Sequence, residues 1–163
     1  LLWGCAVVRQ VNRRLFFVCA KRAVVLLEAG EMHGQNLSNV VWAFSQARLA
    51  NRMLFGAVAS QDVWSRGAFS SQHITNVLWA FSRIHGKIGI YRDFFDAAAE
   101  VAIPMLPRFK TQELANLLWT FANQTMYHPA LFAAAAVEAR ARLGDFDNFD
   151  LSQLLWSFAK VWW

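Results

Sequence analysis

Apolar and polar residues recur along the chain with helical periodicity, and one eight-residue pattern of them appears four times. The copies read LSNVVWAF at residues 37–44, ITNVLWAF at 74–81, LANLLWTF at 114–121 and LSQLLWSF at 151–158, and LLWGCA at 1–6 matches the back half of a fifth. At about 100° per residue, the apolar positions of each copy fall on one side of a helix. Self-similarity at a fixed period of a few tens of residues is typical of solenoid proteins.

The spacing of one tryptophan shows where the repeats differ in length. Successive copies of this tryptophan are 39, 37, 40 and 37 residues apart. Comparison of the copies places the additional residues in two turns, at 86–93 and 30–33. Turns tolerate insertions because they lie at the surface, outside the helix packing. The aligned tryptophans are Trp3, Trp42, Trp79, Trp119 and Trp156.

The pattern predicts nine helices arranged in pairs, and no strand. We expect glycine in the left-handed conformation to end helices at Gly30 and Gly144. Pro104 and Pro107 should stop the helix before them, whereas Pro129 suits a first helical turn. The predicted helices are 1–9, 13–29, 35–48, 52–65, 72–85, 91–103, 112–125, 130–143 and 149–161. The expected N-caps of the repeat-bearing helices are Gly34, Ser71, Thr111 and Asn148.

These elements predict an all-α fold, a right-handed two-layer α-solenoid of helix–turn–helix repeats of about 38 residues. Residues 1–163 are interpreted as a single continuous array of about four and a half repeats, without an internal boundary. Both ends are apolar, whereas a solenoid normally ends in a polar capping repeat. We therefore expect the chain to be a fragment, cut within a repeat at both ends.

Each repeat-bearing helix should present three different surfaces. One side is apolar and packs on the partner helix, and small residues on its flanks let successive helices lie close together. The remaining face carries an amide and the tryptophan, which hardly change between copies and are therefore interpreted as packing residues. This structural signature consists of Asn39, Trp42, Asn76, Trp79, Asn116, Trp119 and Trp156.

Other positions on the same face vary between copies, as residues that read different bases should. Rings stack on bases, amides read base edges and cations contact phosphates, so this face suits single-stranded RNA. Varied polar residues are also common on exposed helix faces without a function. The candidate RNA-contact residues are Gln46, Arg83, Asn123, Lys160, Asn36, His73, Gln35, Gln72 and Gln112.

Composition and charge narrow the classes of partner. The chain is 56% hydrophobic, but no apolar run approaches the roughly 18 residues that span a bilayer, so no membrane partner is expected. Residues 1–92 carry 11 Lys and Arg and 3 Asp and Glu, a net +8, whereas residues 93–163 carry 5 and 8, a net −3. A basic half suggests an anionic partner, although an ordinary solvated surface explains it equally well.

Catalytic and metal-binding patterns are absent from the sequence. The four histidines share no metal-ligand spacing, and Gly86–Lys87 lacks the upstream glycine of a phosphate-binding loop. Cys5 and Cys19 provide neither a disulfide framework nor a metal site. We therefore expect no enzyme activity, no catalytic residue, no metal, no cofactor and no small-molecule substrate.

The repeat resembles a known family. LANLLWTFA at 114–122, followed by PALFAAAA at 129–136, is similar to the octotricopeptide repeat, a paired-helix repeat of about 38 residues. Similar arrays occur in organellar RNA-binding proteins, in the helical regions of FAST-kinase-like and RAP proteins, and in a subunit of the kinetoplastid RNA-editing substrate-binding complex. The resemblance covers the whole chain, with departures at Gln153, Phe149 and Gly4–Cys5.

The resemblance implies binding of single-stranded RNA in a mitochondrion or plastid, for RNA stability, processing, editing or translation. It implies no catalytic activity, since no nuclease-like domain is present. The alternative is a protein–protein scaffold whose concave groove grips a peptide or helix. The basic first half favours RNA, whereas the acidic second half and the apolar helices favour the scaffold.

Overall fold

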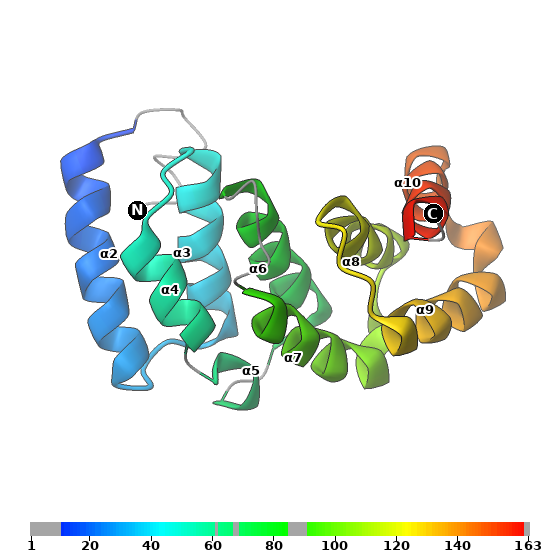
Figure 1. Cartoon of the computed structure of the whole chain (residues 1–163), viewed down its shortest axis with the longest axis horizontal. Coiled ribbons are helices and arrows are strands. Elements are labelled where there is room, and N and C mark those ends of the chain that lie inside the picture. The colour runs from blue at the N-terminus through cyan, green and yellow to red at the C-terminus, as the bar shows by residue number, and fades with distance from the viewer. Residues whose placement is uncertain (1–10, 61, 67–68, 85–90, 162–163) are drawn as a thin grey trace. The chain divides into compact units, whose positions relative to one another are not determined.

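The structure is a computed structural model, and it describes residues 11–60, 62–66, 69–84 and 91–161 (Figure 1). Within these ranges it contains nine α-helices and two 3₁₀-helices and no strand, which confirms the all-α prediction. The helix predicted at 1–9 lies outside the described residues. The chain divides into two compact units, Leu1–Gly86 and Lys87–Trp163, which are described separately. The right-handed sense and the single array stay predictions.

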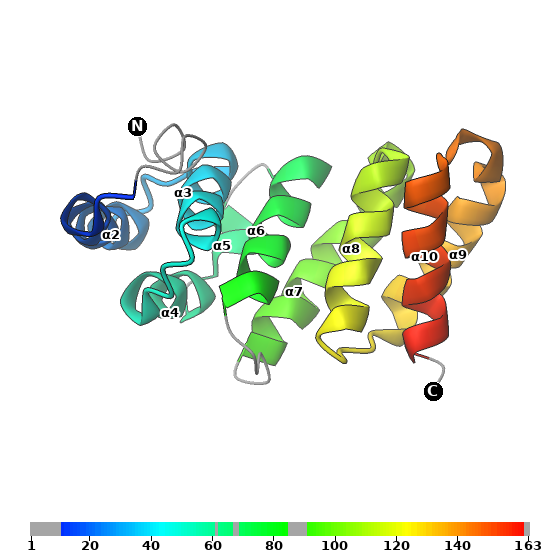
Figure 2. The same cartoon turned by 90° about the horizontal axis from the view of Figure 1, so that it is seen from above.

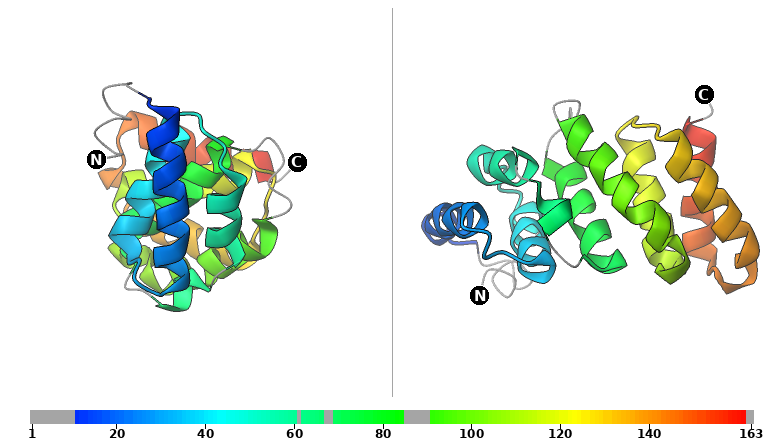
Figure 3. Two further views of the ribbon diagram at one scale, coloured as in Figure 1. Left: turned by 90° about the vertical axis from the view of Figure 1, so that its left-hand side faces the viewer. Right: turned by 90° about the horizontal axis from the view of Figure 1, so that it is seen from below.

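Unit 1 is built in two layers. The repeat-bearing helices α3 and α6 lie side by side, and α2 packs on α4 (Figure 2). Figure 3 shows α2, in blue, beside α3 and α4. Edge-to-face phenylalanines join the layers, with ring centres 5.0 Å apart for Phe16 and Phe44 and 4.8 Å apart for Phe55 and Phe81. The helices are α2 (Arg13–Glu28), α3 (Gly34–Gln46), α4 (Arg52–Ser60), α5 (Val63–Arg66) and α6 (Ser71–Ile84).

Unit 2 repeats this arrangement. The repeat-bearing helices α8 and α10 lie side by side, and α9 packs on α7 and η2. Phe95 and Phe121 join the layers, with ring centres 5.4 Å apart, and Arg142 donates a 2.8 Å hydrogen bond to the carbonyl oxygen of Phe109. The elements are α7 (Arg92–Ala102), η2 (Ile103–Arg108), α8 (Thr111–Asn123), α9 (Pro129–Ala141), η3 (Leu143–Asp145) and α10 (Asn148–Val161).

The two units correspond residue by residue at a constant interval. Trp42 and Trp119 are 77 residues apart, and so are Trp79 and Trp156. The helices follow the same interval, since α3 and α8 begin at residues 34 and 111, and α6 and α10 at 71 and 148. A residue of unit 1 between positions 34 and 84 therefore has an equivalent in unit 2 at its number plus 77.

Small residues line the contacts between repeat-bearing helices, as predicted. Ala43 and Ala80 are fully buried, and so is Thr120 in the other unit. Ser152 and Ala159 of α10 are exposed, so that flank of α10 is not covered within the described residues. The buried flank residues are Ser38, Ala43, Ser45, Thr75, Ala80, Ser82, Ala115, Thr120, Ala122 and Ser157.

Several predicted boundaries are wrong. The helix predicted at 52–65 is two helices, α4 and α5, and Asp62 lies outside both. The hydroxyl of Ser65 donates to the backbone carbonyl of Asp62 at 3.1 Å and to its carboxylate at 2.5 Å. Short polar side chains compete with helical backbone bonding in this way. Gly144 does not end α9, which stops at Ala141, and it lies instead within η3. Pro104 and Pro107 follow the end of α7, as expected, and the chain tightens there into η2.

The predicted N-caps are displaced by one residue. Gly34, Ser71, Thr111 and Asn148 are the first residues of their helices, so the cap positions belong to the residues before them. An N-cap side chain bonds the backbone N–H three residues later. Accordingly, the Asp147 carboxylate accepts from the N–H of Asp150 at 2.7 Å. The capping positions are His33, Ser70, Lys110 and Asp147.

Left-handed residues end three helices. Gly30, as predicted, has φ 73°, and Arg48 and Thr125 have φ 54° and 53° at the ends of α3 and α8. After Arg48, the N–H of Leu49 donates to the carbonyl of Phe44 at 2.9 Å, and the N–H of Arg48 donates to Ser45. The equivalent bonds follow Thr125. These are Schellman endings, in which glycine is the usual left-handed residue.

The first turn of α9 is held by a histidine. Nδ1 of His128 accepts a 3.2 Å hydrogen bond from the N–H of Leu131, and its Nε2 lies 3.3 Å from a carboxylate oxygen of Glu100 on α7. Pro129 occupies the first helical position, as predicted. One side chain thus caps α9 and joins it to α7.

Candidate nucleic-acid interface

The predicted RNA-contact residues lie on the repeat-bearing helices and are accessible. Arg83 and Lys160 are exposed in the last turns of α6 and α10, while His73 is half-buried. This accessibility is what a contact surface requires, but it does not by itself identify a ligand. The exposed candidates are Gln35, Asn36, Gln46, Gln72, Arg83, Gln112, Asn123 and Lys160.

In unit 1, the signature tryptophan and a candidate contact residue lie together. The guanidinium carbon of Arg83 lies 5.0 Å from the centre of the Trp79 ring, one helical turn away on α6. Trp79 is half-buried, so one part of its ring packs while another part remains available to the arginine. A guanidinium stacked on a ring by its face keeps its N–H donors free at the edges. The pair therefore presents an oriented cation to solvent.

His73 already has a structural role. Its Nδ1 accepts from the N–H of Ser70 at 3.3 Å, and the hydroxyl of Ser70 accepts from the N–H of His73 at 3.2 Å. This reciprocal pair is a capping box at the start of α6. Glu113 occupies the equivalent place in α8 and accepts from the N–H of Lys110 at 3.0 Å. The variation at this position is thus linked to helix capping, and an RNA contact by His73 stays a prediction.

In unit 2, two signature positions contact their equivalents in the next repeat. The Trp119 and Trp156 rings are 6.4 Å apart between centres, with a 35° angle between their planes. Beside them, the side-chain amide of Gln153 donates a 2.8 Å hydrogen bond to Oδ1 of Asn116. In the described part of the chain no such bond joins Asn39 to Asn76. The contacts support the predicted packing role for these residues in unit 2, and that role stays a prediction in unit 1.

A polar pocket of about 340 Å³ opens between the C-terminal ends of α3 and α6, and sequence reasoning missed most of it. Arg83 contributes one wall, and Arg48 contributes a second cation from its left-handed position after α3. The hydroxyl of Ser45, also a lining residue, is buried and has no hydrogen-bond partner among the described residues. Ala50 and Ile84 complete the lining.

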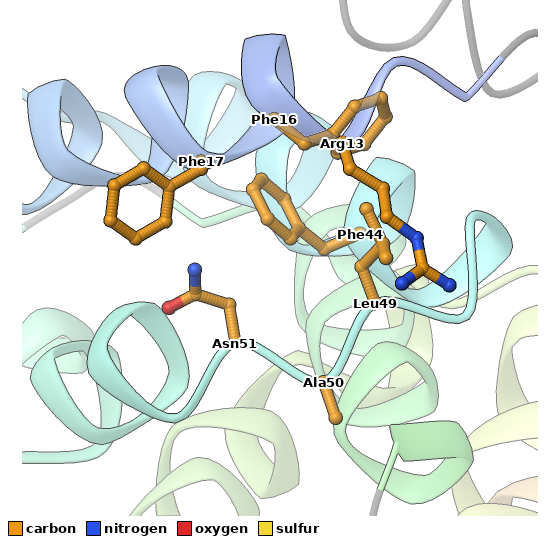
Figure 4. Close-up of a pocket in the computed structure, with 7 residues that line it drawn as sticks. All are labelled: Arg13, Phe16, Phe17, Phe44, Leu49, Ala50 and Asn51. Atoms are coloured by element: carbon orange, nitrogen blue, oxygen red, sulfur yellow. The ribbon is translucent and has the colours of Figure 1, made fainter.

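A second pocket, of about 180 Å³, shares Ala50 with the first, and Figure 4 shows the residues that line it. Its walls are aromatic, and Phe17, which contributes to them, is half exposed. The Asn51 amide points from the turn toward α2 in Figure 4. Its oxygen caps α4 by accepting from the N–H of Leu54, and its NH₂ group has no hydrogen-bond partner among the described residues. The lining residues are Arg13, Phe16, Phe17, Phe44, Leu49, Ala50 and Asn51.

Asp150 is a buried carboxylate in unit 2. Burial raises its pKa above the usual 3.8, the charge of Asp147 raises it further, and the 3.2 Å hydrogen bond from the hydroxyl of Thr111 opposes the shift. This contact joins α8 to α10, so we assign Asp150 a packing role.

The described residues form neither a metal-ion site nor a membrane-spanning helix. They contain no cluster of three or more His, Cys, Asp or Glu side chains placed to hold a metal ion. None of the described helices combines the length and apolar character needed to cross a bilayer. The accessible groups described above are arginines, amides and half-buried rings, which can bind ligands by charge, hydrogen bonding and stacking.

The chain matches the model of a known protein family. The family model described as RNA-editing substrate-binding complex 6 protein matches residues 2–90, which is more than half of the chain and includes unit 1 from its second residue onward. A comparison with curated proteins gives no match.

Proposed function

Because the chain belongs to the family of RNA-editing substrate-binding complex 6 proteins, we propose that it acts in an RNA-editing substrate-binding complex and binds single-stranded RNA there. The match covers the unit that contains the Trp79–Arg83 pair and the Arg48–Arg83 pocket. The resemblance to organellar repeats extends the proposal to a mitochondrion or plastid. The proposed role is binding and includes no catalytic step.

The observation that carries this proposal is the stacking of Arg83 on Trp79. A stacked arginine is held in place before binding, so less side-chain entropy is lost when its N–H donors meet a phosphate. The residue four after the signature tryptophan varies between repeats, with Gln46, Asn123 and Lys160 at the other copies. Position and variation together are what a contact residue requires.

The charge of unit 1 supports the same partner. Its described residues form no ion pair between side chains, and the acidic residues between positions 1 and 86 are Glu28, Glu31 and Asp62. Unpaired cations on a folded surface attract anions and speed their association. Neutralised phosphates release counterions, so binding to RNA should weaken steeply as salt increases.

The test is equilibrium binding of fluorescein-labelled single-stranded RNA by anisotropy over a salt series, with duplex DNA as competitor. We expect salt-sensitive binding that duplex DNA competes for poorly. Arg83→Gln should weaken it, whereas Arg14→Gln, which removes the same charge from an exposed site on α2, should weaken it much less. Absence of binding at low salt, or equal affinity for duplex DNA, would contradict the proposal.

Protein binding is the second candidate, and a surface of unit 2 favours it. On α10, Phe149 is 71% exposed, Leu155 60% and Trp156 42%. Large exposed apolar side chains grouped on one helix are typical of interaction sites. If the RNA assay fails, cross-linking of the chain to purified subunits of the complex, with Leu155→Lys as the comparison, tests this role.

A further inference from the structure

We propose that the pocket lined by Ser45, Arg48 and Arg83 is a phosphate-binding site, and that its occupant is a backbone phosphate of single-stranded RNA. The assignment of RNA as the source rests on the proposed function, whereas the phosphate chemistry rests on the pocket alone. The pocket lies entirely within unit 1, at the ends of two adjacent repeat-bearing helices.

The first support is the charge of the pocket. Two arginines line one cavity of about 340 Å³, and no acidic residue among those the structure describes lines it. Neither arginine forms an ion pair among the described residues. Two like charges in one pocket repel each other, and a bound anion relieves that repulsion. Arginine suits phosphate in particular, because its planar N–H donors match two oxygens at once.

The second support is the backbone at Arg48. The residue has φ 54°, a conformation that costs little for glycine and more for a residue with a side chain. Gly30 shows that this chain uses glycine at the same kind of helix ending. A strained position held by a charged residue that faces a pocket points to a function for the side chain.

The third support is the buried hydroxyl of Ser45. Its equivalent in the next repeat, Ser82, donates to the carbonyl of Trp79 at 2.8 Å, whereas Ser45 has no partner in the described part of the chain. A buried polar group without a hydrogen bond is costly, and a phosphate oxygen is an acceptor that this hydroxyl lacks. An unsatisfied hydroxyl thus lies in the wall of the pocket, beneath the surface that a ligand would first touch.

The neighbouring aromatic pocket explains why RNA is favoured over free phosphate. Ala50 lines both pockets, so a phosphate site and an aromatic surface share one short turn. Single-stranded RNA presents phosphates and unstacked bases in the same succession. A free phosphate ion would use the first pocket only.

Unit 2 provides a built-in control, because it lacks the same pocket chemistry. The positions 77 residues after Ser45 and Arg48 are Ala122 and Thr125, and only Lys160 retains the charge of Arg83. Thr125 nevertheless has the same left-handed conformation, with φ 53°. Glycine at position 48 or 125 thus relieves the same kind of strain, but only the change at position 48 removes a cation.

The experiment compares Arg48→Gly with Thr125→Gly in the full chain. We expect both variants to unfold at or above the temperature of the parent. Arg48→Gly should bind single-stranded RNA about tenfold more weakly. Its plot of log affinity against log salt should be shallower by about 0.7, the value for one phosphate contact on a single strand. Thr125→Gly should bind like the parent.

A second arm uses inorganic phosphate as the probe, at constant ionic strength against chloride. We expect phosphate to raise the unfolding temperature of the parent and of Thr125→Gly, but not of Arg48→Gly. Should Arg48→Gln, which keeps the backbone strain, retain full RNA affinity and salt slope while the parent binds RNA, the pocket assignment is wrong and the proposed function stands.

The remaining outcomes separate the two proposals. Protection by phosphate through Arg48 without any RNA binding would keep the phosphate site, assign it to a free phosphate and overturn the proposed function. If the parent neither binds RNA nor responds to phosphate, both proposals fail.

Discussion

The side-chain amide of Gln153 donates to Oδ1 of Asn116 at 2.8 Å, so equivalent positions of two adjacent repeats are hydrogen-bonded. Asn76, the equivalent of Gln153 in unit 1, is one methylene shorter and forms no such bond with Asn39 in the described residues. The longer side chain at position 153 therefore provides a link between α8 and α10.

Shortening this link should lower stability. We expect Gln153→Asn to reduce the free energy of unfolding by about 1 kcal/mol, because a partly buried acceptor loses its partner. Urea unfolding followed by far-UV circular dichroism measures the change. Gln112→Asn, at an exposed position of α8, is the control and should unfold like the parent. Equal midpoints for the two variants would show that the hydrogen bond contributes nothing.

The capping box at the start of α6 makes a second prediction. Ser70→Ala removes the acceptor for the N–H of His73, and we expect a loss of about 1 kcal/mol in unfolding free energy. Ser71→Ala is the control, because it makes the same substitution at the next residue, which is already inside the helix. It should change the unfolding free energy little. If Ser71→Ala lowered the unfolding free energy as much as Ser70→Ala, the assignment of Ser70 as the cap would be wrong.

The buried Asp150 predicts a pH dependence. Because its pKa is raised in the folded protein, the folded state binds this proton more tightly than the unfolded state does. Stability should therefore fall as pH rises from about 3.8 through the raised pKa, and then level off. Asp150→Asn should remove this fall, as measured by urea unfolding across that interval. Asp145→Asn, at an exposed acid of the same unit, should retain it.

Trp79 is predicted mainly to pack. Truncating a fully buried tryptophan costs about 3–5 kcal/mol. Since Trp79 is only half-buried, we expect Trp79→Ala to cost less than this. It should weaken RNA binding less than Arg83→Gln does, because the cation remains and only its orienting ring is lost. Trp79→Phe preserves a ring for Arg83, and its unfolding free energy should lie between those of Trp79→Ala and the parent. A Trp79→Ala variant that melts like the parent but loses RNA would instead make the ring a stacking platform.

Gln46 and Asn123 test whether exposed amides of the repeat-bearing helices distinguish between RNA bases. Both are exposed at the end of a repeat-bearing helix, so the double change to alanine should alter unfolding free energy by less than about 0.5 kcal/mol. We expect it to change which homopolymeric RNA binds best. An unchanged order of preference among the homopolymers would exclude these positions as readers.

The repeat pattern was sufficient to place the helices, because the same apolar positions are buried between the two helix layers in successive copies. Leu37, Ile74 and Leu114 occupy the same place in three copies, and all are fully buried. Local competition was harder to anticipate. Asp62 interrupts a stretch whose composition suits a helix. Each N-cap lies one residue earlier than expected, because a cap side chain bonds the backbone N–H three residues after it, as Asp147 bonds that of Asp150.

The pocket could not be predicted from one repeat alone, because its two cations come from different copies. Arg83 stood out as a varied position, but Arg48 lies beyond the helix that contains the pattern. One signal was present in the sequence, since the helix before it ends without the glycine that such endings favour. Only the backbone geometry shows that Arg48 is the residue in the left-handed conformation.

The cap on α9 also determines where a proton lies. To accept from the N–H of Leu131, Nδ1 of His128 must carry a lone pair, so the neutral ring has its hydrogen on Nε2, toward Glu100. One ring therefore serves two helices, with an acceptor for the first turn of α9 at one nitrogen and a donor directed at α7 at the other.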